Sequence, residues 1–213
     1  MSSAKEKVLE MVASGKISPS QGDELLAAMA PAGPSIWQIL FHPAARLGLG
    51  PSLAIGAIAS LGALVLTRFG VSFDGALDAH SASVSVPMAL VQVALYWPLV
   101  ALVFWLAAKL AGKSTRLVDH LAAVGIARLP YTLLGLTVLP LRSLDPSRPL
   151  AFSPLQAVAI FTGLPLLVWS VALLCTGFRA VSGLRGGRLA LTLVIAVLVA
   201  EVISKVLLAL IPL

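Results

Sequence analysis

Five long apolar runs dominate this sequence and limit what it can fold into. Each run reaches the length of about 20 residues that a helix needs to cross a bilayer. The runs cover residues 48–69, 86–111, 119–141, 155–178 and 188–212. The composition agrees, since only 11% of the 213 residues are charged, against roughly 25% in an average soluble domain. The sequence therefore predicts an all-α, polytopic membrane protein with five transmembrane helices in residues 48–213.

The first 30 residues differ from the rest and predict a small cytoplasmic helical hairpin. Ser18, Pro19 and Gln21 mark the start of its second helix, because serine caps, proline suits the first turn and glutamine closes a capping box. Each helix has one apolar stripe, and the stripes consist of Val8, Leu9 and Val12, and of Leu25, Leu26 and Met29. Two helices of about three turns bury too little surface to be stable alone. We therefore expect these six residues to bind a membrane-protein partner or a second copy of the chain.

A Pro-rich segment, residues 31–47, joins the hairpin to the spans and forms a linker or lies along the membrane surface. The basic residues of the loops predict the orientation, because cytoplasmic loops carry an excess of lysine and arginine. Two turns on one side hold Lys109, Lys113 and Arg116, and Arg179, Arg185 and Arg188. The N-terminus is therefore expected in the cytoplasm and the C-terminus outside. Arg185 and Arg188 are expected to contact anionic lipid headgroups.

Two stretches resemble a known membrane-protein family. They read GKSTRLVDHLAAVGIARLPYTLL, residues 112–134, and LLVWSVALLCTGFRAVSGLRGGRLALTLVIAVL, residues 166–198. Each is a span flanked by a short basic turn, and together they resemble the Yip1 family of five-span membrane proteins. The resemblance implies five spans, a cytoplasmic N-terminus and no known catalytic centre.

The N-terminal hairpin carries a second resemblance. The stretch MVASGKISPSQGDELLAAM is similar to a short helical-hairpin (SHOCT-like) module of bacterial membrane and regulatory proteins. The combination implies a bacterial branch of the family and the bacterial cytoplasmic (inner) membrane. The Asp-Leu-x-Gly-Pro type motif of eukaryotic members is absent from FHPAARLGLGP, so the resemblance does not imply their trafficking role.

No pattern of catalytic residues stands out, and the sequence predicts neither an enzyme nor a cofactor. His42 and His120 are expected inside and His80 outside, and no His/Cys/Asp/Glu set has the spacing of metal ligands. Asp74 and Asp78, with His80, allow loose cation binding in the outer loop, although a solvated loop is the expected interpretation. No basic run interleaved with aromatic residues is present, which argues against nucleic-acid binding.

Three charged residues lie inside the predicted spans, where function is the first hypothesis: Arg128, Glu201 and Lys205. Glu201 and Lys205 have the i,i+4 spacing that lets a carboxylate meet an ammonium group. Lys205 lies near the outer end and can extend its ammonium group to water. Glu201 needs a donor and Arg128 an acceptor, so we expect these two side chains to meet. Such a pair holds the bundle together or forms part of a transport path.

These features together predict a non-enzymatic integral membrane scaffold or assembly factor that binds membrane-protein partners or itself. The alternative is a small transporter or channel for a solute, ion or lipid, with a polar site around Arg128 and Glu201. A water-filled path to these two residues favours transport, whereas a dry bundle and an apolar hairpin face favour the scaffold.

Overall fold

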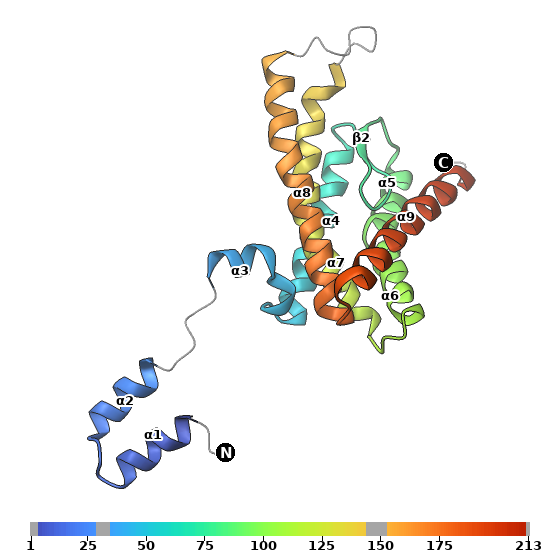
Figure 1. Ribbon diagram of the computed structural model, residues 1–213. Helices are drawn as coiled ribbons and strands as arrows, with labels where there is room; N and C mark the ends of the chain where they lie inside the picture. Colours follow the sequence, from blue (N-terminus) through green and yellow to red (C-terminus); the bar gives the residue numbers. More distant parts are fainter. Residues whose placement is uncertain (1–3, 29–34, 144–152, 212–213) are drawn as a thin grey trace. The chain divides into compact units, whose positions relative to one another are not determined.

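The computed structural model describes residues 4–28, 35–143 and 153–211 of the chain (Figure 1). It divides into two compact units, Met1–Trp37 and Gln38–Leu213.

The first unit contains the helices α1 (Ala4–Ala13) and α2 (Pro19–Ala28). Gly15, in the turn between them, has a φ of 69°, a left-handed conformation that glycine adopts without strain. The predicted capping box is present, since Ser18 Oγ accepts from the Gln21 N–H (3.2 Å) and Gln21 Oε1 accepts from the Ser18 N–H (2.9 Å). Val8 is buried, and these local signals are enough to define the hairpin.

The second unit confirms the five predicted spans. Within the described residues, the helices long and apolar enough to cross a bilayer are Leu49–Thr67, Val86–Leu110, Leu117–Leu141, Pro154–Ser182 and Gly186–Leu210. The elements of this unit, with the short helix that precedes them, are α3 (Ile36–Phe41), η1 (Pro43–Ala45), α4 (Leu49–Thr67), β1 (Val71–Phe73), β2 (Ala79–Ser81), α5 (Val86–Ala94), η2 (Leu95–Leu99), α6 (Val100–Leu110), α7 (Leu117–Val138), η3 (Leu139–Ser143), α8 (Pro154–Ser182) and α9 (Gly186–Leu210). The protein is an all-α, multi-pass membrane protein, and its described residues contain one two-stranded sheet.

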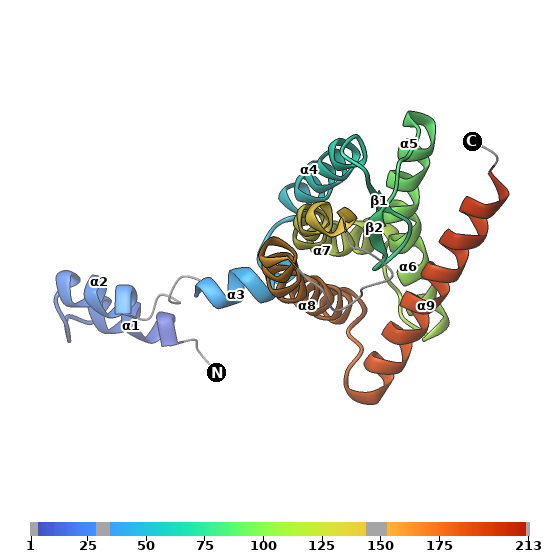
Figure 2. The same ribbon diagram turned by 90° about the horizontal axis from the view of Figure 1, so that it is seen from above.

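Helix α7 is the centre of the bundle, and α4, α6 and α8 pack around it (Figure 2). Its contact with α4 is close because glycines face each other: a Cβ on Gly56 would lie 2.8 Å from the Cα of Gly125. Ser52 and Ser60 lie on the same buried face of α4. Small residues at helical spacing permit this approach in membrane bundles.

The second span changes geometry at its middle proline. Residues Leu95–Leu99 form one π-helical turn that contains Pro98, which has no N–H to donate. This turn places Tyr96 and Trp97 against α7, where Trp97 Nε1 donates to the Leu121 carbonyl (2.8 Å). Helix α9 packs along α6 at the side of the bundle and exposes a stripe that includes Val194, Leu198 and Val202 (Figures 1 and 2).

Candidate functional site

A short β-hairpin connects α4 to α5, and its tip is buried in the bundle. β1 and β2 pair antiparallel, with Ser72 opposite His80, and the Asp74 N–H donates to the Asp78 carbonyl (3.0 Å) to close the turn. Phe73 and Ala76 are 1% and 0% exposed. Asp74, Asp78 and His80, for which a solvated loop was expected, are partly exposed, whereas the apolar residues of this hairpin pack among the helices. We call residues 74–78 the loop tip.

Arg128, near the middle of α7, binds the loop tip through its guanidinium group. Nη1 donates to the carbonyl of Ala76 at 2.6 Å, and the side chain is completely buried. The guanidinium carbon lies 4.6 Å from the ring centroid of Tyr96 and 5.2 Å from that of Tyr131, so two aromatic rings also stabilise the charge. Nε and Nη2 have no hydrogen-bond partner among the described residues.

Glu201, on α9, binds the other polar groups of the same tip. Its Oε2 accepts from the N–H of Ala76 (2.8 Å) and from that of Leu77 (3.3 Å). The approach is so close that a Cβ on Gly75 would lie 2.6 Å from Oε2. Residue 75 must therefore be glycine for this carboxylate to reach the backbone.

The structure differs here from the expected direct contact of Arg128 with Glu201. Among the described residues, no ion pair within 4.0 Å joins them. Instead, both bind Ala76, one at its carbonyl and the other at its N–H. The reason is that the loop tip lies between the two helices and its backbone polar groups need partners away from water.

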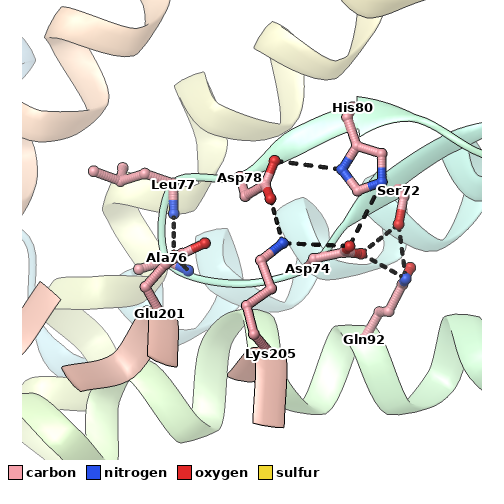
Figure 3. A network of polar contacts seen from close by, with 9 residues as sticks. All are labelled: Ser72, Asp74, Ala76, Leu77, Asp78, His80, Gln92, Glu201 and Lys205. Atoms are coloured by element: carbon pink, nitrogen blue, oxygen red, sulfur yellow. Dashed lines mark hydrogen bonds and ion pairs between the residues drawn. The ribbon is translucent and has the colours of Figure 1, made fainter. Parts of the chain in front are cut away.

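Lys205 does not pair with Glu201, as the i,i+4 spacing had indicated, but with two carboxylates of the loop tip. Its ammonium group lies against the carboxylates of Asp78 and Asp74, at 3.4 Å from Asp74 Oδ2, while Glu201 is turned toward the loop tip (Figure 3). His80 bridges the same carboxylates, with Nε2 3.5 Å from Asp74 Oδ2 and Nδ1 3.3 Å from Asp78 Oδ1. These contacts attach the loop tip to α9.

Two further polar side chains hold Asp74 from the opposite side. Gln92, on α5, donates from Nε2 to Asp74 Oδ1 (2.8 Å) and to Ser72 Oγ (2.7 Å), and the Ser72 hydroxyl donates to the same carboxylate (Figure 3). Gln92 and Ser72 are buried, so this part of the network is shielded from water. Asp74 is thereby tied to α5 and α9 at once.

The ionisation of Asp78 reflects these contacts. Partial burial alone would raise the pKa of its carboxyl group, but the hydrogen bond and the positive charge of Lys205, together with His80, hold that pKa below its usual value. Asp78 is therefore a carboxylate at neutral pH and a steady partner for Lys205.

The same residues meet the geometric requirement for a cation site. Ligand atoms of Asp74, Asp78 and His80 lie within 4.8 Å of one another. The ammonium group of Lys205, however, already lies against both carboxylates and supplies the positive charge that they need. His42 and His120 belong to other parts of the fold, at the end of α3 and in α7.

Sequence reasoning missed the two tyrosines that enclose Arg128. The Tyr96 hydroxyl donates to the Arg128 carbonyl (3.1 Å) and lies 2.5 Å from Thr132 Oγ1, which in turn donates to the carbonyl of Ala59 (3.0 Å). The rings of Tyr96 and Tyr131 stack with centroids 5.8 Å apart. A usable signal was present, since the only two tyrosines of the chain both fall inside predicted spans.

The other predicted site residues lie outside this network. In the hairpin, Leu9 and Leu25 are 51% and 41% exposed, while Val12 and Leu26 are half-buried. Met29 lies outside the described residues. Arg185 and Arg188 are exposed at the connection between α8 and α9. Hence the structure brings together Arg128, Glu201 and Lys205 around the loop tip. The N-terminal helical hairpin and the pair Arg185 and Arg188 form separate surfaces.

Comparison with known proteins places the fold in context. One family model, described as the Yip1 domain, matches residues 20–208. No curated protein and no solved structure matches the chain.

Proposed function

The chain belongs to the Yip1 domain family, and on this premise we propose that it is a non-enzymatic membrane scaffold or assembly factor. Its five spans make the lipid bilayer its environment. The scaffold binds another membrane protein or a second copy of the chain through the N-terminal hairpin.

The binding of Arg128 and Glu201 to the backbone of the loop tip is the observation that carries this proposal. Arg128 is 0% exposed, and its Nη1 and the Glu201 carboxylate are both bound to the backbone of the loop tip. Charges that couple to a transported substrate face a water-filled cavity. Here they instead satisfy backbone groups that would otherwise be unpaired inside the bundle, which favours a structural role.

The hairpin supplies the binding surface in this proposal. Val8 is buried, while Leu9 and Leu25 remain about half exposed. Large apolar side chains exposed on so small a unit favour association with another surface, because burying a leucine contributes about 1.5–3 kcal/mol. The unequal distribution of basic residues supports a cytoplasmic position for the hairpin and an outer position for the C-terminus, in a bacterial inner membrane.

A pair of charge insertions in the hairpin tests the binding role. Leu9→Asp combined with Leu25→Asp places charges on exposed apolar positions and leaves the spans untouched. We expect normal membrane insertion but loss of cross-linking to partners or to a second copy in cells. The matched control is Ala13→Asp combined with Ser20→Asp, which adds one charge to each helix at other exposed positions. Unchanged cross-linking in the leucine variant would refute the proposal.

The alternative function, transport of a solute, ion or lipid, has one structural feature in its favour. The loop tip is non-helical backbone within the bundle, and such backbone is characteristic of pathways in membrane proteins. Displacement of the tip would uncover Arg128 and Glu201. A flux assay in proteoliposomes distinguishes the two functions: Arg128→Met abolishes flux in a transporter, and no flux above that of empty vesicles is expected for a scaffold.

A further inference from the structure

A positively charged hollow lies where α8 meets α9, at the opposite end of the bundle from the loop tip. Its volume is about 400 Å³, and the polar side chains in its lining are His42, Thr176, Arg179 and Arg185. Both arginines are exposed, and neither forms an ion pair with any residue that the structure describes. Unpaired cations that converge on one hollow favour an anionic ligand.

The backbone next to this hollow also favours an anion. Arg185 is the N-cap residue of α9, and no side chain caps the first turn of that helix. The first residues, Gly186 and Gly187, have no side chains and are exposed, and Arg188 follows them. Free N–H groups and the positive end of the helix dipole attract negatively charged groups. The arginines and the N-terminal end of α9 therefore both favour binding of an anion.

The position of His42 depends on a contact between distant segments. Trp169 Nε1, on α8, donates to the carbonyl of Leu40 in α3 at 2.9 Å. This hydrogen bond fixes the end of α3 against α8, so His42 lines the hollow although it precedes Arg179 by more than a hundred residues. The hollow is thus built by the tertiary fold and not by one loop.

A second hollow adjoins the first and has both apolar and polar residues in its lining. It measures about 450 Å³, shares Ala180 with the first, and is lined by Leu47, Leu49 and Val181 among others. Its only basic residue, Arg116, is already paired with Asp119 at 2.8 Å. A ligand that fits both hollows has an anionic group next to an apolar one.

We propose that Arg179, Arg185 and Arg188 bind the phosphate group of an anionic phospholipid, whose apolar part contacts the adjoining hollow. Phosphate suits arginine, because the planar guanidinium group donates two parallel hydrogen bonds to its oxygens. This site lies on the side of the membrane that the basic residues assign to the cytoplasm, where anionic headgroups attract basic clusters. The proposal does not depend on what the N-terminal hairpin binds.

Lipid binding to the full-length protein in mild detergent tests the site. Phosphatidylglycerol is titrated against phosphatidylcholine, with the shift in unfolding temperature and the lipid retained in native mass spectra as the two measurements. Phosphatidylglycerol is expected to raise the unfolding temperature and to be retained, and phosphatidylcholine is not. Inorganic phosphate separates the two sources of the anion: an equal shift with phosphate alone would assign the site to a free phosphate and overturn the lipid proposal.

Charge removal locates the binding. Arg179→Gln with Arg185→Gln should weaken phosphatidylglycerol binding about 30-fold, because each cation near an anionic lipid contributes roughly a factor of five. Lys109→Gln with Lys113→Gln removes the same charge from the neighbouring turn and should retain the shift. If the glutamine variant does not fold, Arg179→Lys with Arg185→Lys replaces it in the test, because this variant keeps both charges. It should bind phosphatidylglycerol more weakly than the native protein, because lysine cannot form the bidentate contact with phosphate. The assignment would be overturned if the Arg179/Arg185 and Lys109/Lys113 glutamine variants lost phosphatidylglycerol binding equally. It would also be overturned if Arg179→Lys with Arg185→Lys bound phosphatidylglycerol as tightly as the native protein.

Discussion

The two ends of the bundle use charged residues in opposite ways. At the loop tip, Lys205 binds Asp74 and Asp78, and Glu201 binds backbone N–H groups. At the connection of α8 to α9, Arg179 and Arg185 line a hollow without a described carboxylate partner. Charges whose partners lie within the chain stabilise the fold, whereas charges left without partners are available to ligands. The role of a charged side chain is therefore determined by its partners and not by its type.

The largest expected effect comes from the two residues that hold Ala76. Arg128→Met and Glu201→Leu should each destabilise the protein by about 1–3 kcal/mol for every backbone group of the loop tip that is left without its hydrogen-bond partner. Thermal unfolding in detergent measures this loss. Lys113→Met, at a partly exposed position without an ion pair to any described residue, is the control and should change stability little.

The double variant, Arg128→Met with Glu201→Leu, tests whether the two charges act through the backbone of Ala76 or through a direct ion pair. It removes both charges but leaves the carbonyl and N–H of Ala76 and the N–H of Leu77 without partners, at about 1–3 kcal/mol for each unsatisfied buried group. We therefore expect the double variant to be no more stable than either single variant. Recovery toward native stability would show that the two charges act as a direct pair and that the loop tip contributes little.

A smaller effect is expected at Gly75. Gly75→Ala introduces a Cβ at 2.6 Å from Glu201 Oε2 and should force this flexible side chain away from the loop tip, at a cost of about 1 kcal/mol. Gly187→Ala, at the other end of the bundle, meets no atom within 4 Å and should be neutral or slightly stabilising. Thermal unfolding compares the stability of the two variants. Equal unfolding temperatures would contradict the close contact at Gly75.

The ion pairs of the loop tip should give a modest dependence of stability on pH. The pKa of Asp78 is lower in the folded protein than its usual value of 3.8, so the stability it contributes is present above about pH 4 and is lost as the pH falls through the folded pKa. The pair is partly exposed, and its contribution should be less than about 1 kcal/mol. Thermal unfolding at pH 7 and pH 3 should show a smaller difference for Asp78→Asn than for the native protein. An identical difference in both would exclude Asp78 as a source of the dependence.

The smallest effect is expected at Arg185 and Arg188, at the connection of α8 to α9. In detergent without anionic lipid, Arg185→Gln and Arg188→Gln should change stability by no more than about 0.5 kcal/mol, because both side chains are exposed and have no partner in the described chain. A larger loss in thermal unfolding would mean that these arginines hold the fold, and the contrast between the two ends would fail.

Most of the fold was predictable because its signals are local. The length of an apolar run decides whether a helix crosses the bilayer, and five such runs appear in the structure as five helices. The capping box at Ser18 and Gln21 is equally local, since its partners are three residues apart. The buried β-hairpin was not predicted, because each strand has only three residues and its apolar pattern is too short to distinguish from a loop.

The candidate site was predictable only in part. A charge inside an apolar run is costly, so the sequence alone identified Arg128, Glu201 and Lys205 as residues that need partners. It did not identify Tyr96 and Tyr131 as the rings around Arg128, since they come from two different spans that meet only in the folded bundle.

By itself, therefore, the sequence determined the number of spans, the hairpin and the positions of the intramembrane charges. Tertiary structure alone decided what those charges bind. Ala76 is 52 residues from Arg128 and 125 residues from Glu201, and the groups that they contact are its carbonyl and its N–H. Every residue except proline carries both of these groups, so no side-chain pattern distinguishes the one peptide unit that the fold places between two helices.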